Sequence, residues 1–363
     1  MTRRLITKMS NPLVSFQENT MNPTTRLCTR VLLPAALSLA APLAALAQSN
    51  VSVYGLMDMS AGQFQSAGAT KVWRADSGNM TTSFIGFKGS EDLGGGLSAV
   101  FRIEHFLRLD QGAAGRFNGD AFWARNAFVG LQGSFGTTTL GRNTTPLFVS
   151  TLIFNAVGDS FGFSPSIRQL FTPSTGLAFF GDTGWNNSIL YSSPSLGGAT
   201  INLAGNLGEG AGGAAGRNIG GNVLYFGGPI AATAAFQQVK NGAFGTPAGW
   251  KSQDTFQLGL SYDLTLAKLF GQYSRVKTKA TADTQTTLYG FGASVPIGAG
   301  KLLAQYGNAK ADFGATEVTN KTLTVGYDHN LSKNTDLYAM LMNDKRTALS
   351  TGNSVAAGVR VRY

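Results

Sequence analysis

The chain is poor in the residues that most catalytic and redox sites use. Among 363 residues there is one cysteine, Cys28, and there are two histidines. A single cysteine excludes an internal disulfide and a metal site built from several thiolates. Charged residues make up 13% of the chain, whereas globular proteins in water usually carry about a quarter. The shortage of charge favours a surface that partly contacts lipid.

Long apolar runs are also missing, with one exception near the start. An apolar tract over residues 31–47 follows Arg26 and Arg30 and ends with Ala45-Leu46-Ala47. A basic region, an apolar region and an A-x-A site are together typical of a secretory signal. A retained membrane anchor is the alternative, and two prolines within the tract argue against it.

The sequence therefore predicts two parts. Residues 1–47 are expected to be a signal peptide that is removed, with Met1 or Met21 as the true start, and residues 48–363 to form one domain. Residues 1–47 contain five basic residues and one acidic residue, so the net charge of +10 falls to +6 in the mature part. That excess predicts an anionic partner or permeant.

Two-residue alternation is the main pattern in the mature part. In Leu97–His105, for example, Phe101 and Ile103 share one face of a strand, and Arg102 and Glu104 share the other. Segments Thr82–Gly89 and Ala124–Gln132 alternate in the same way. Because no long apolar helix accompanies this pattern, it indicates a closed barrel that crosses a bilayer with strands.

Extending the pattern along the chain predicts an all-β fold, a transmembrane antiparallel β-barrel of about 16 strands. We place the strands at 50–60, 80–90, 97–107, 121–132, 137–143, 184–193, 199–207, 219–227, 230–239, 253–263, 267–276, 285–295, 301–309, 319–328, 335–344 and 353–363. Short connections, such as Gly133–Gly136, alternate with long ones. The long ones are expected at Gln65–Asn79, Gly208–Asn218, Asn241–Gln253 and Lys310–Thr319.

Several motifs carry a family resemblance. Gly86–Gly94 reads GFKGSEDLG, Ala124–Leu131 reads ARNAFVGL, and Phe135–Arg142 reads FGTTTLGR, while the last strand ends in the aromatic Tyr363. With these motifs the chain resembles the general porins of Gram-negative outer membranes. The resemblance implies a homotrimer of 16-stranded channels, and recognition of the C-terminal strand by the barrel-assembly machinery. Outer-membrane lipid and lipopolysaccharide are its other expected partners, and no nucleic acid is expected.

The longest stretch without a strand, Thr144–Gly181, is named the third loop. A loop of this length in a compact design is usually functional, and the resemblance implies that it folds into the lumen and narrows it. Its candidate constriction residues are Asp159, Arg168, Phe154, Phe161 and Phe163. Burial of so many aromatic side chains against the inner wall is favoured over exposure on the cell surface. An outward loop that contacts a neighbouring subunit is the alternative.

The resemblance also implies a row of basic side chains on the wall opposite the third loop. The matching positions are Lys88, Arg125 and Arg142, and strand alternation adds Arg102. A row of fixed cations favours passage of anions. Alternatively, each arginine pairs with a carboxylate in the lumen, for which Glu104 and Asp58 are candidates. Phe84 stands where the family commonly has another arginine, so the predicted row is one cation shorter.

The predicted function is a water-filled outer-membrane channel for passive diffusion of small hydrophilic solutes, weakly selective for anions. One alternative is a channel specific for aromatic or organic acids, suggested by the phenylalanines of the third loop. Another is an enzyme or adhesin on a barrel scaffold. Gly158–Gly162 matches the G-x-S-x-G nucleophile pattern, but neither the strand before it nor the helix after it is predicted. We expect no enzyme activity, no catalytic residue, no metal site and no cofactor.

Overall fold

The computed structural model describes residues 50–363 except 173–178, 209–216, 241, 243–248 and 315. The predicted signal peptide lies outside the described residues. The strands are β1 (Asn50–Phe64), β2 (Val72–Ser77), β3 (Phe84–Gly94), β4 (Leu97–Arg108), β5 (Ala113–Ala114), β6 (Asn126–Gly133), β7 (Gly136–Thr144), β8 (Gly184–Ser192), β9 (Ala199–Asn206), β10 (Ile219–Gly227), β11 (Ile230–Val239), β12 (Ser252–Asp263), β13 (Lys268–Lys279), β14 (Thr284–Ile297), β15 (Gly300–Asp312), β16 (Glu317–Asn330), β17 (Thr335–Arg346) and β18 (Gly352–Arg362). The helices are α1 (Pro146–Ile153) and α2 (Pro165–Phe171).

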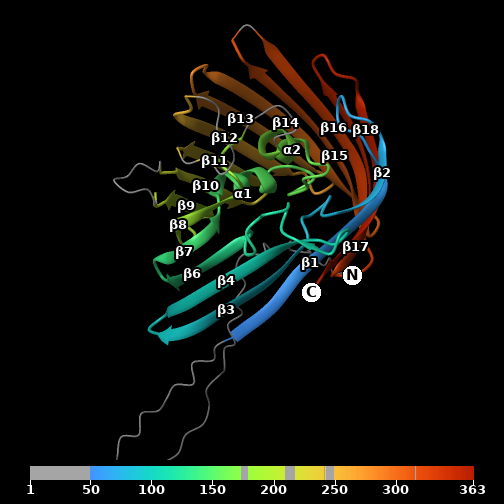
Figure 1. Cartoon of the computed structure of the whole chain (residues 1–363). Helices are drawn as coiled ribbons and strands as arrows, with labels where there is room; N and C mark the ends of the chain where they lie inside the picture. The colour runs from blue at the N-terminus through green and yellow to red at the C-terminus, as the bar shows by residue number, and fades with distance from the viewer. Residues whose placement is uncertain (1–49, 173–178, 209–216, 241, 243–248, 315) are drawn as a thin grey trace, which may run out of the picture. The chain divides into compact units, whose positions relative to one another are not determined.

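These strands form one antiparallel sheet that closes on itself (Figure 1). The ring is closed by β1 and β18, where Asp58 lies opposite Arg360. Two of the eighteen labelled strands add no new position to the ring. β2 and β3 both pair with β1, one with each half, and β5 has two residues that pair with the end of β4. The barrel therefore has 16 strands, as the alternation predicts.

Alternation separates an inner from an outer face on each strand. In β18, Val355, Val359 and Val361 are exposed on the outer face, while Ser354 and Arg360 are buried on the inner one. The same two-residue pattern of exposed apolar and buried polar side chains runs through β11–β17. An apolar band outside and polar side chains inside are the arrangement of a barrel that spans a membrane. In the described part of the chain, no helix combines the length and the apolar character that crossing a bilayer requires.

Several boundaries differ from the predictions. The stretch Gln65–Asn79 was expected to be a loop, but Val72–Ser77 forms β2 against the far half of β1. β15 and β16 extend to Asp312 and Glu317, so the long connection expected at Lys310–Thr319 shrinks to 313–316. The strand expected from residue 121 begins at Asn126.

The late start of β6 has a local cause. Phe122 stacks on His105 of β4 with ring centroids 3.9 Å apart, and Trp123 packs edge-on against both rings. His105 Nδ1 also contacts the backbone oxygen of Phe122. These contacts fold residues 121–125 into turns instead of continuing the ladder.

Candidate functional site

The third loop connects β7 to β8, and its helices α1 and α2 lie inside the barrel (Figure 1). Its described residues are 145–172 and 179–183. Helix α1 begins after Thr145, whose Oγ1 accepts a hydrogen bond from the Phe148 N–H, and Pro146 occupies its first position. Helix α2 begins in the same way with Ser164 and Pro165. A Ser or Thr cap followed by proline is a recognised start signal for helices. The sequence contained that signal, but our predictions placed no helix here.

Neutral polar side chains of the inner wall hold the third loop. The inner faces of β9–β16, which α1 and α2 contact, are named the covered wall. Asn222 Nδ2 donates to the Pro146 oxygen at 2.8 Å, Gln272 Nε2 to the Thr151 oxygen at 2.7 Å, and Thr324 Oγ1 to the Phe163 oxygen at 2.7 Å. These bonds cross the interior, so the loop is packed against the inner face.

Glycines on the covered wall let the backbone of the third loop approach closely. A Cβ added at Gly307 would stand 2.6 Å from Pro165 Cβ, and one at Gly259 would stand 2.8 Å from Phe154 Cβ. Phe154 and Phe163 are fully buried, while Phe161 is half-buried. Burial of these aromatic side chains against the inner wall agrees with what their composition favours.

The tip of the third loop contacts the wall again at residues 78–83, between β2 and β3. Ser160 Oγ donates to the Asn79 oxygen at 2.6 Å, and Thr81 Oγ1 donates to Asp159 Oδ1 at 3.1 Å. Asp58 holds this turn, because its Oδ2 accepts the backbone N–H groups of Met80 and Thr81, each at 2.7 Å. Asp159 and Asp58 thus lie at the loop tip and beneath it.

Arg168 does not point at the same place. It lies in α2, is 8% exposed, donates to the Gly162 oxygen at 3.2 Å and faces Asp344 of β17 at 3.9 Å. Its contacts therefore fasten α2 to the wall.

The predicted basic residues divide into two kinds. Arg125 pairs with Glu104 at 2.6 Å and lies 3.9 Å from the centre of the Phe84 ring. Lys88 and Arg102 form an ion pair with no carboxylate of the described residues. These two cations stand directly opposite each other on β3 and β4. The inner faces of β3, β4 and β6 are named the open wall, because neither α1 nor α2 packs on them.

Aromatic rings support the two unpaired cations. Lys88 Nζ lies 4.9 Å from the centre of the Tyr54 ring, and the Arg102 guanidinium lies 5.7 Å from that of Phe128. Rings attract a cation without neutralising it. Like charges placed directly opposite in a sheet are destabilising, so the Lys88–Arg102 pair lowers the stability of the fold.

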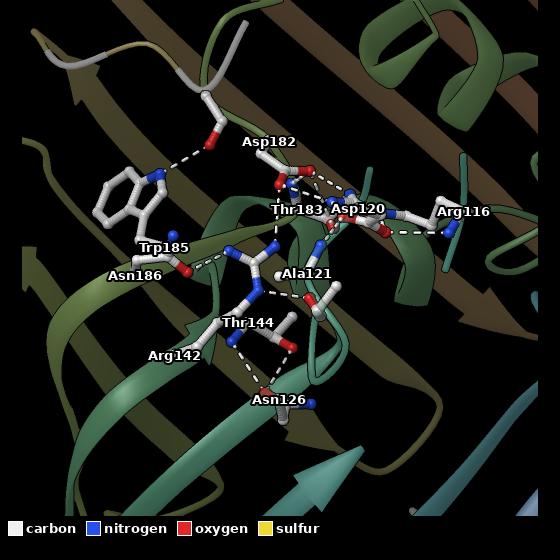
Figure 2. Close-up of polar contacts among 12 residues, drawn as sticks. Arg116, Asp120, Ala121, Asn126, Arg142, Thr144, Asp182, Thr183, Trp185 and Asn186 are labelled. Carbon is white, nitrogen blue, oxygen red and sulfur yellow. Dashed lines mark hydrogen bonds and ion pairs between the residues drawn. The ribbon is translucent and has the colours of Figure 1, made fainter. Parts of the chain in front are cut away.

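Arg142, the fourth predicted cation, belongs to an ionic cluster at the end of the third loop (Figure 2). Its Nη2 lies 3.0 Å from Asp182 Oδ2, and Arg116 Nη1 lies 2.6 Å from Asp182 Oδ1. Arg116 also pairs with Asp120 at 2.9 Å, and Arg142 donates to Asn186 at 2.7 Å and to the Ala124 oxygen. The alternative that each arginine pairs with a carboxylate thus describes Arg142 and Arg125.

Electrostatics keep this cluster ionised. Burial alone would raise the pKa of Asp182, but the guanidinium groups of Arg116 and Arg142 outweigh burial and hold that pKa below its ordinary value. The pKa of Asp120 is lowered in the same way by Arg116. Sequence reasoning missed Arg116 and Asp182, because both lie in connections outside the strands, where two-residue alternation assigns no face.

A second ionic group, also missed as a site, lies on the inner face beside the barrel closure. Arg360 donates to Asp336 at 2.7 Å, to Asp328 at 2.8 Å and to Thr81 at 3.1 Å. Since Thr81 in turn donates to Asp159, a chain of hydrogen bonds connects the last strand to the loop tip. The alternation put Arg360 on the polar face of its strand, but partners on β16 and β17 could not be read from spacing.

The G-x-S-x-G pattern has no catalytic surroundings here. α2 begins soon after Gly162, so a helix does follow, contrary to our prediction, but α1 and not a strand precedes it. Ser160 is fully buried and bonded to the backbone of residue 79. Among the described residues, no group of three or more His, Cys, Asp or Glu side chains could hold a metal ion.

A closed barrel with an inserted loop and charged inner walls defines a channel protein of the outer membrane. The family described as Gram-negative porin has a sequence model that matches residues 35–349, and this chain belongs to that family. It is 35% identical over 335 residues to outer membrane porin protein 32 of Delftia acidovorans, covering 88% of this chain and 91% of that one.

Two further relatives agree with this assignment. An outer membrane porin protein of Bordetella pertussis is 26% identical over 392 aligned positions, covering 92% of this chain and 99% of the other. The solved structure of an anion-selective porin from Comamonas acidovorans is similar with a TM-score of 0.72 and 28% identity, covering 87% of this chain and all of that one. The protein is therefore an integral porin of the outer membrane, a class of channels for passive diffusion.

Proposed function

We propose that this porin conducts small hydrophilic solutes with a preference for anions, set by the open wall. The observation that carries the proposal is the Lys88–Arg102 pair, two cations in direct register without a carboxylate partner among the described residues. Fixed charges lining a pore select against ions of the same sign. The similar Comamonas protein is named an anion-selective porin, which supports the same direction.

The mechanism is a sieve with a charged side. The third loop packs on the covered wall and occupies that side of the lumen. The solute path therefore runs beside the open wall, where Lys88 is exposed to solvent. An anion there gains about 1 kcal/mol per unit charge at close approach in a water-filled pore. Asp159 and Arg125 are also predicted constriction residues. Asp159 lies at the loop tip, where Thr81 donates to it, and Arg125 pairs with Glu104. Because each has such a partner, both contribute a weaker electric field to the pore.

A planar bilayer recording in a potassium chloride gradient tests this proposal. We expect a reversal potential of the sign that chloride preference gives, and a fall of about fivefold or more in the chloride-to-potassium permeability ratio in K88Q/R102Q. K88R/R102K keeps both charges and is the matched control, with an unchanged ratio. Cation preference of the wild type, or an unchanged ratio in K88Q/R102Q, would show that the open wall does not select.

A channel specific for aromatic or organic acids gains no support from the third loop. Phe154 and Phe163, two of the aromatic side chains that suggested it, are buried in packing against the wall. Conductance block by one aromatic acid at low concentration would nevertheless revive that alternative.

We also propose that the channels assemble as a homotrimer. The outer face of β1 supports this, because Val51 and Val53 are 60% and 56% exposed beside an uncharged surface. Tyr363 places an aromatic side chain at the end of the closing strand, in keeping with the proposed recognition by the barrel-assembly machinery. Native mass measurement in mild detergent decides the oligomeric state, and a monomer as the sole species would contradict the trimer.

A further inference from the structure

The wall of the barrel is interrupted at residues 78–83, which are named the inner turn. β2 and β3 both pair with β1, and the inner turn is the connection between them. Gly78 begins it with a φ of +72°, in the left-handed region that favours glycine. Met80 is buried in one apolar cluster with Phe163 of the third loop. The inner turn therefore projects into the barrel, toward the third loop.

Asp58 of β1 is fully buried and holds the inner turn from the wall. Its Oδ2 accepts the backbone N–H groups of Met80 and Thr81 at 2.7 Å each, and its Oδ1 accepts the Tyr338 hydroxyl at 2.6 Å. The Asp58 backbone oxygen also accepts the Gly78 N–H at 2.9 Å. Hydrogen bonds to an ionised acceptor are about twice as strong as neutral ones. One carboxylate therefore fixes two successive N–H groups of the inner turn.

The inner turn holds the tip of the third loop through its backbone. Ser160 Oγ and the Gly162 N–H both donate to the Asn79 oxygen, at 2.6 and 3.0 Å. Thr81 Oγ1 donates to Asp159 Oδ1 at 3.1 Å. The approach is close, because a Cβ added at Gly162 would lie 2.6 Å from Asn79 Oδ1. A shift of the inner turn therefore moves the tip as well.

The helices of the third loop are attached to other parts of the wall. α1 contacts β9–β12, and α2 contacts β14–β16. The tip lies between the two helices, and its side chains Asp159 and Phe161, both predicted constriction residues, are half-buried. Movement of the tip therefore changes the lumen beside these two residues while both helices stay in place.

We propose that Asp58 is a positioning residue for the constriction of this channel. It fixes the inner turn, the inner turn fixes the tip of the third loop, and the open channel thereby keeps one conductance level. Asp58 is buried away from the solute path, so it acts through the two N–H groups and not on the permeating ion. Without that acceptor, two N–H groups lose their partner, and other positions of the inner turn become populated.

Single-channel recording of the purified protein in a planar bilayer tests this proposal. D58A removes the acceptor of both N–H groups. Y338F is the matched control, because it removes a buried hydrogen bond from the other oxygen of the same carboxylate and leaves the inner turn held. D58N is the conservative variant, since an amide keeps one oxygen that accepts hydrogen bonds.

We expect D58A to interrupt the open state at least about tenfold more often than the wild type, because one hydrogen bond to a charged group shifts an equilibrium by about that factor. D58N and Y338F should stay within about twofold of the wild type. Closures of D58A at the wild-type frequency would overturn the proposal. Closures in Y338F or D58N as frequent as in D58A would also overturn it, because the inner turn is still held in both.

A disulfide between the inner turn and the tip separates positioning from a general loss of stability. Cys28, in the predicted signal peptide, is the only cysteine of the chain. A Cβ added at Gly162 would lie 2.9 Å from Asn79 Cβ, close to the separation of about 3.5–4.5 Å in a disulfide. The triple variant D58A/N79C/G162C should therefore close at the wild-type frequency when oxidised and at the D58A frequency when reduced. Frequent closures of the oxidised protein, with the bond verified by mass, would overturn the proposal.

A second variant breaks the same contact without touching Asp58, in case D58A does not insert. T81V/S160A removes both side-chain hydrogen bonds between the inner turn and the tip. It should also raise the closure frequency, and wild-type behaviour of this variant would overturn the proposal. The closure frequency is independent of the reversal potential that tests the proposed ion preference, so either proposal can fail without the other.

Discussion

The covered wall and the open wall face the same lumen with opposite chemistry. The covered wall holds the third loop with amides and hydroxyls such as Asn222, Gln272 and Thr324. The open wall carries Lys88 and Arg102, which stand directly opposite each other on β3 and β4. A buried charge must be stripped of water, whereas a buried amide with a partner costs little. The difference shows that neutral side chains supply these hydrogen bonds to the packed loop, whereas the two cations without an ion-pair partner among the described residues stand where neither helix packs.

The ionic cluster around Asp182 lies between the two walls, at the end of the third loop. It fastens the end of the third loop to Arg142 of β7 and to Arg116 of the preceding loop. The middle of the third loop is held mainly by neutral hydrogen bonds, to which Arg168 of α2 adds a contact with Asp344 at 3.9 Å. Variants that remove one kind of attachment at a time separate their contributions.

The largest effect is expected from D182N, which leaves two arginines facing a neutral amide. Removing one partner of a buried ion pair typically costs about 3–5 kcal/mol. Because the pKa of Asp182 is lowered in the folded protein, its stabilisation is complete above the ordinary aspartate pKa of about 3.9 and is lost as the pH falls through the lower, folded value. Thermal unfolding and open-channel noise between pH 7 and pH 2 measure both effects.

In that series the wild type should approach D182N only at the acidic end, and N186A, which removes a neutral partner of the same Arg142, is the control with a small effect. A difference between wild type and D182N that stays constant down to pH 2 would contradict the ionic account.

An intermediate effect is expected from G307L, on the covered wall. The added side chain meets Pro165 and Gln169 of α2, and overpacking of this kind costs about 1–3 kcal/mol. The third loop should be pushed toward the solute path or out of place, which changes single-channel conductance without changing the charge of the open wall. G271L, where a Cβ would meet no atom within 4 Å, is the matched control. Unchanged conductance in G307L would show that close packing at this glycine does not position the loop.

The smallest effect is expected from F84L, on the open wall. The Arg125 guanidinium lies 3.9 Å from the ring centre of Phe84, and a contact of this kind contributes about 0.5–2 kcal/mol. Leucine keeps the apolar packing against Leu56 and Phe106 but removes the ring. The melting temperature should fall slightly, while E104Q, which removes the ion pair of Arg125, should lower it further. Equal melting temperatures for F84L and the wild type would show that the Phe84 ring does not stabilise the Arg125 guanidinium.

Sequence alone predicted the features that depend on alternation within a strand. It missed the contacts between side chains that are far apart in the sequence. The strands and the outer face of Val355, Val359 and Val361 followed from a two-residue period. The pairing of Arg142 with Asp182 did not, because Asp182 lies outside the strands, where alternation assigns no face, and 40 residues separate the partners. Helices α1 and α2 were missed for another reason, since their Thr-Pro and Ser-Pro starts lie in a segment read as one loop.

The predicted wall of four cations stays a prediction, and in the structure its members differ in their partners. Alternation could place Arg102 and Glu104 on one face, yet it could not show that Arg125 takes Glu104 and leaves Arg102 without an ion-pair partner among the described residues. Which cation has an ion-pair partner depends on which side chains reach each other across strands. Spacing along the chain does not contain that information.

The pairing of β1 with β18 at the seam of the barrel means that the barrel can close only after the last strand is in place. Gly55 and Tyr363 exchange backbone hydrogen bonds of 3.1 and 3.2 Å, so the seam joins the earliest and latest described segments of the chain. Until the last strand arrives, β1 has an unpaired edge, and an unpaired edge in lipid costs several kcal/mol for each unsatisfied group. Insertion and ring closure must therefore be coupled, because a partly formed barrel with unpaired strand edges is unstable in the bilayer.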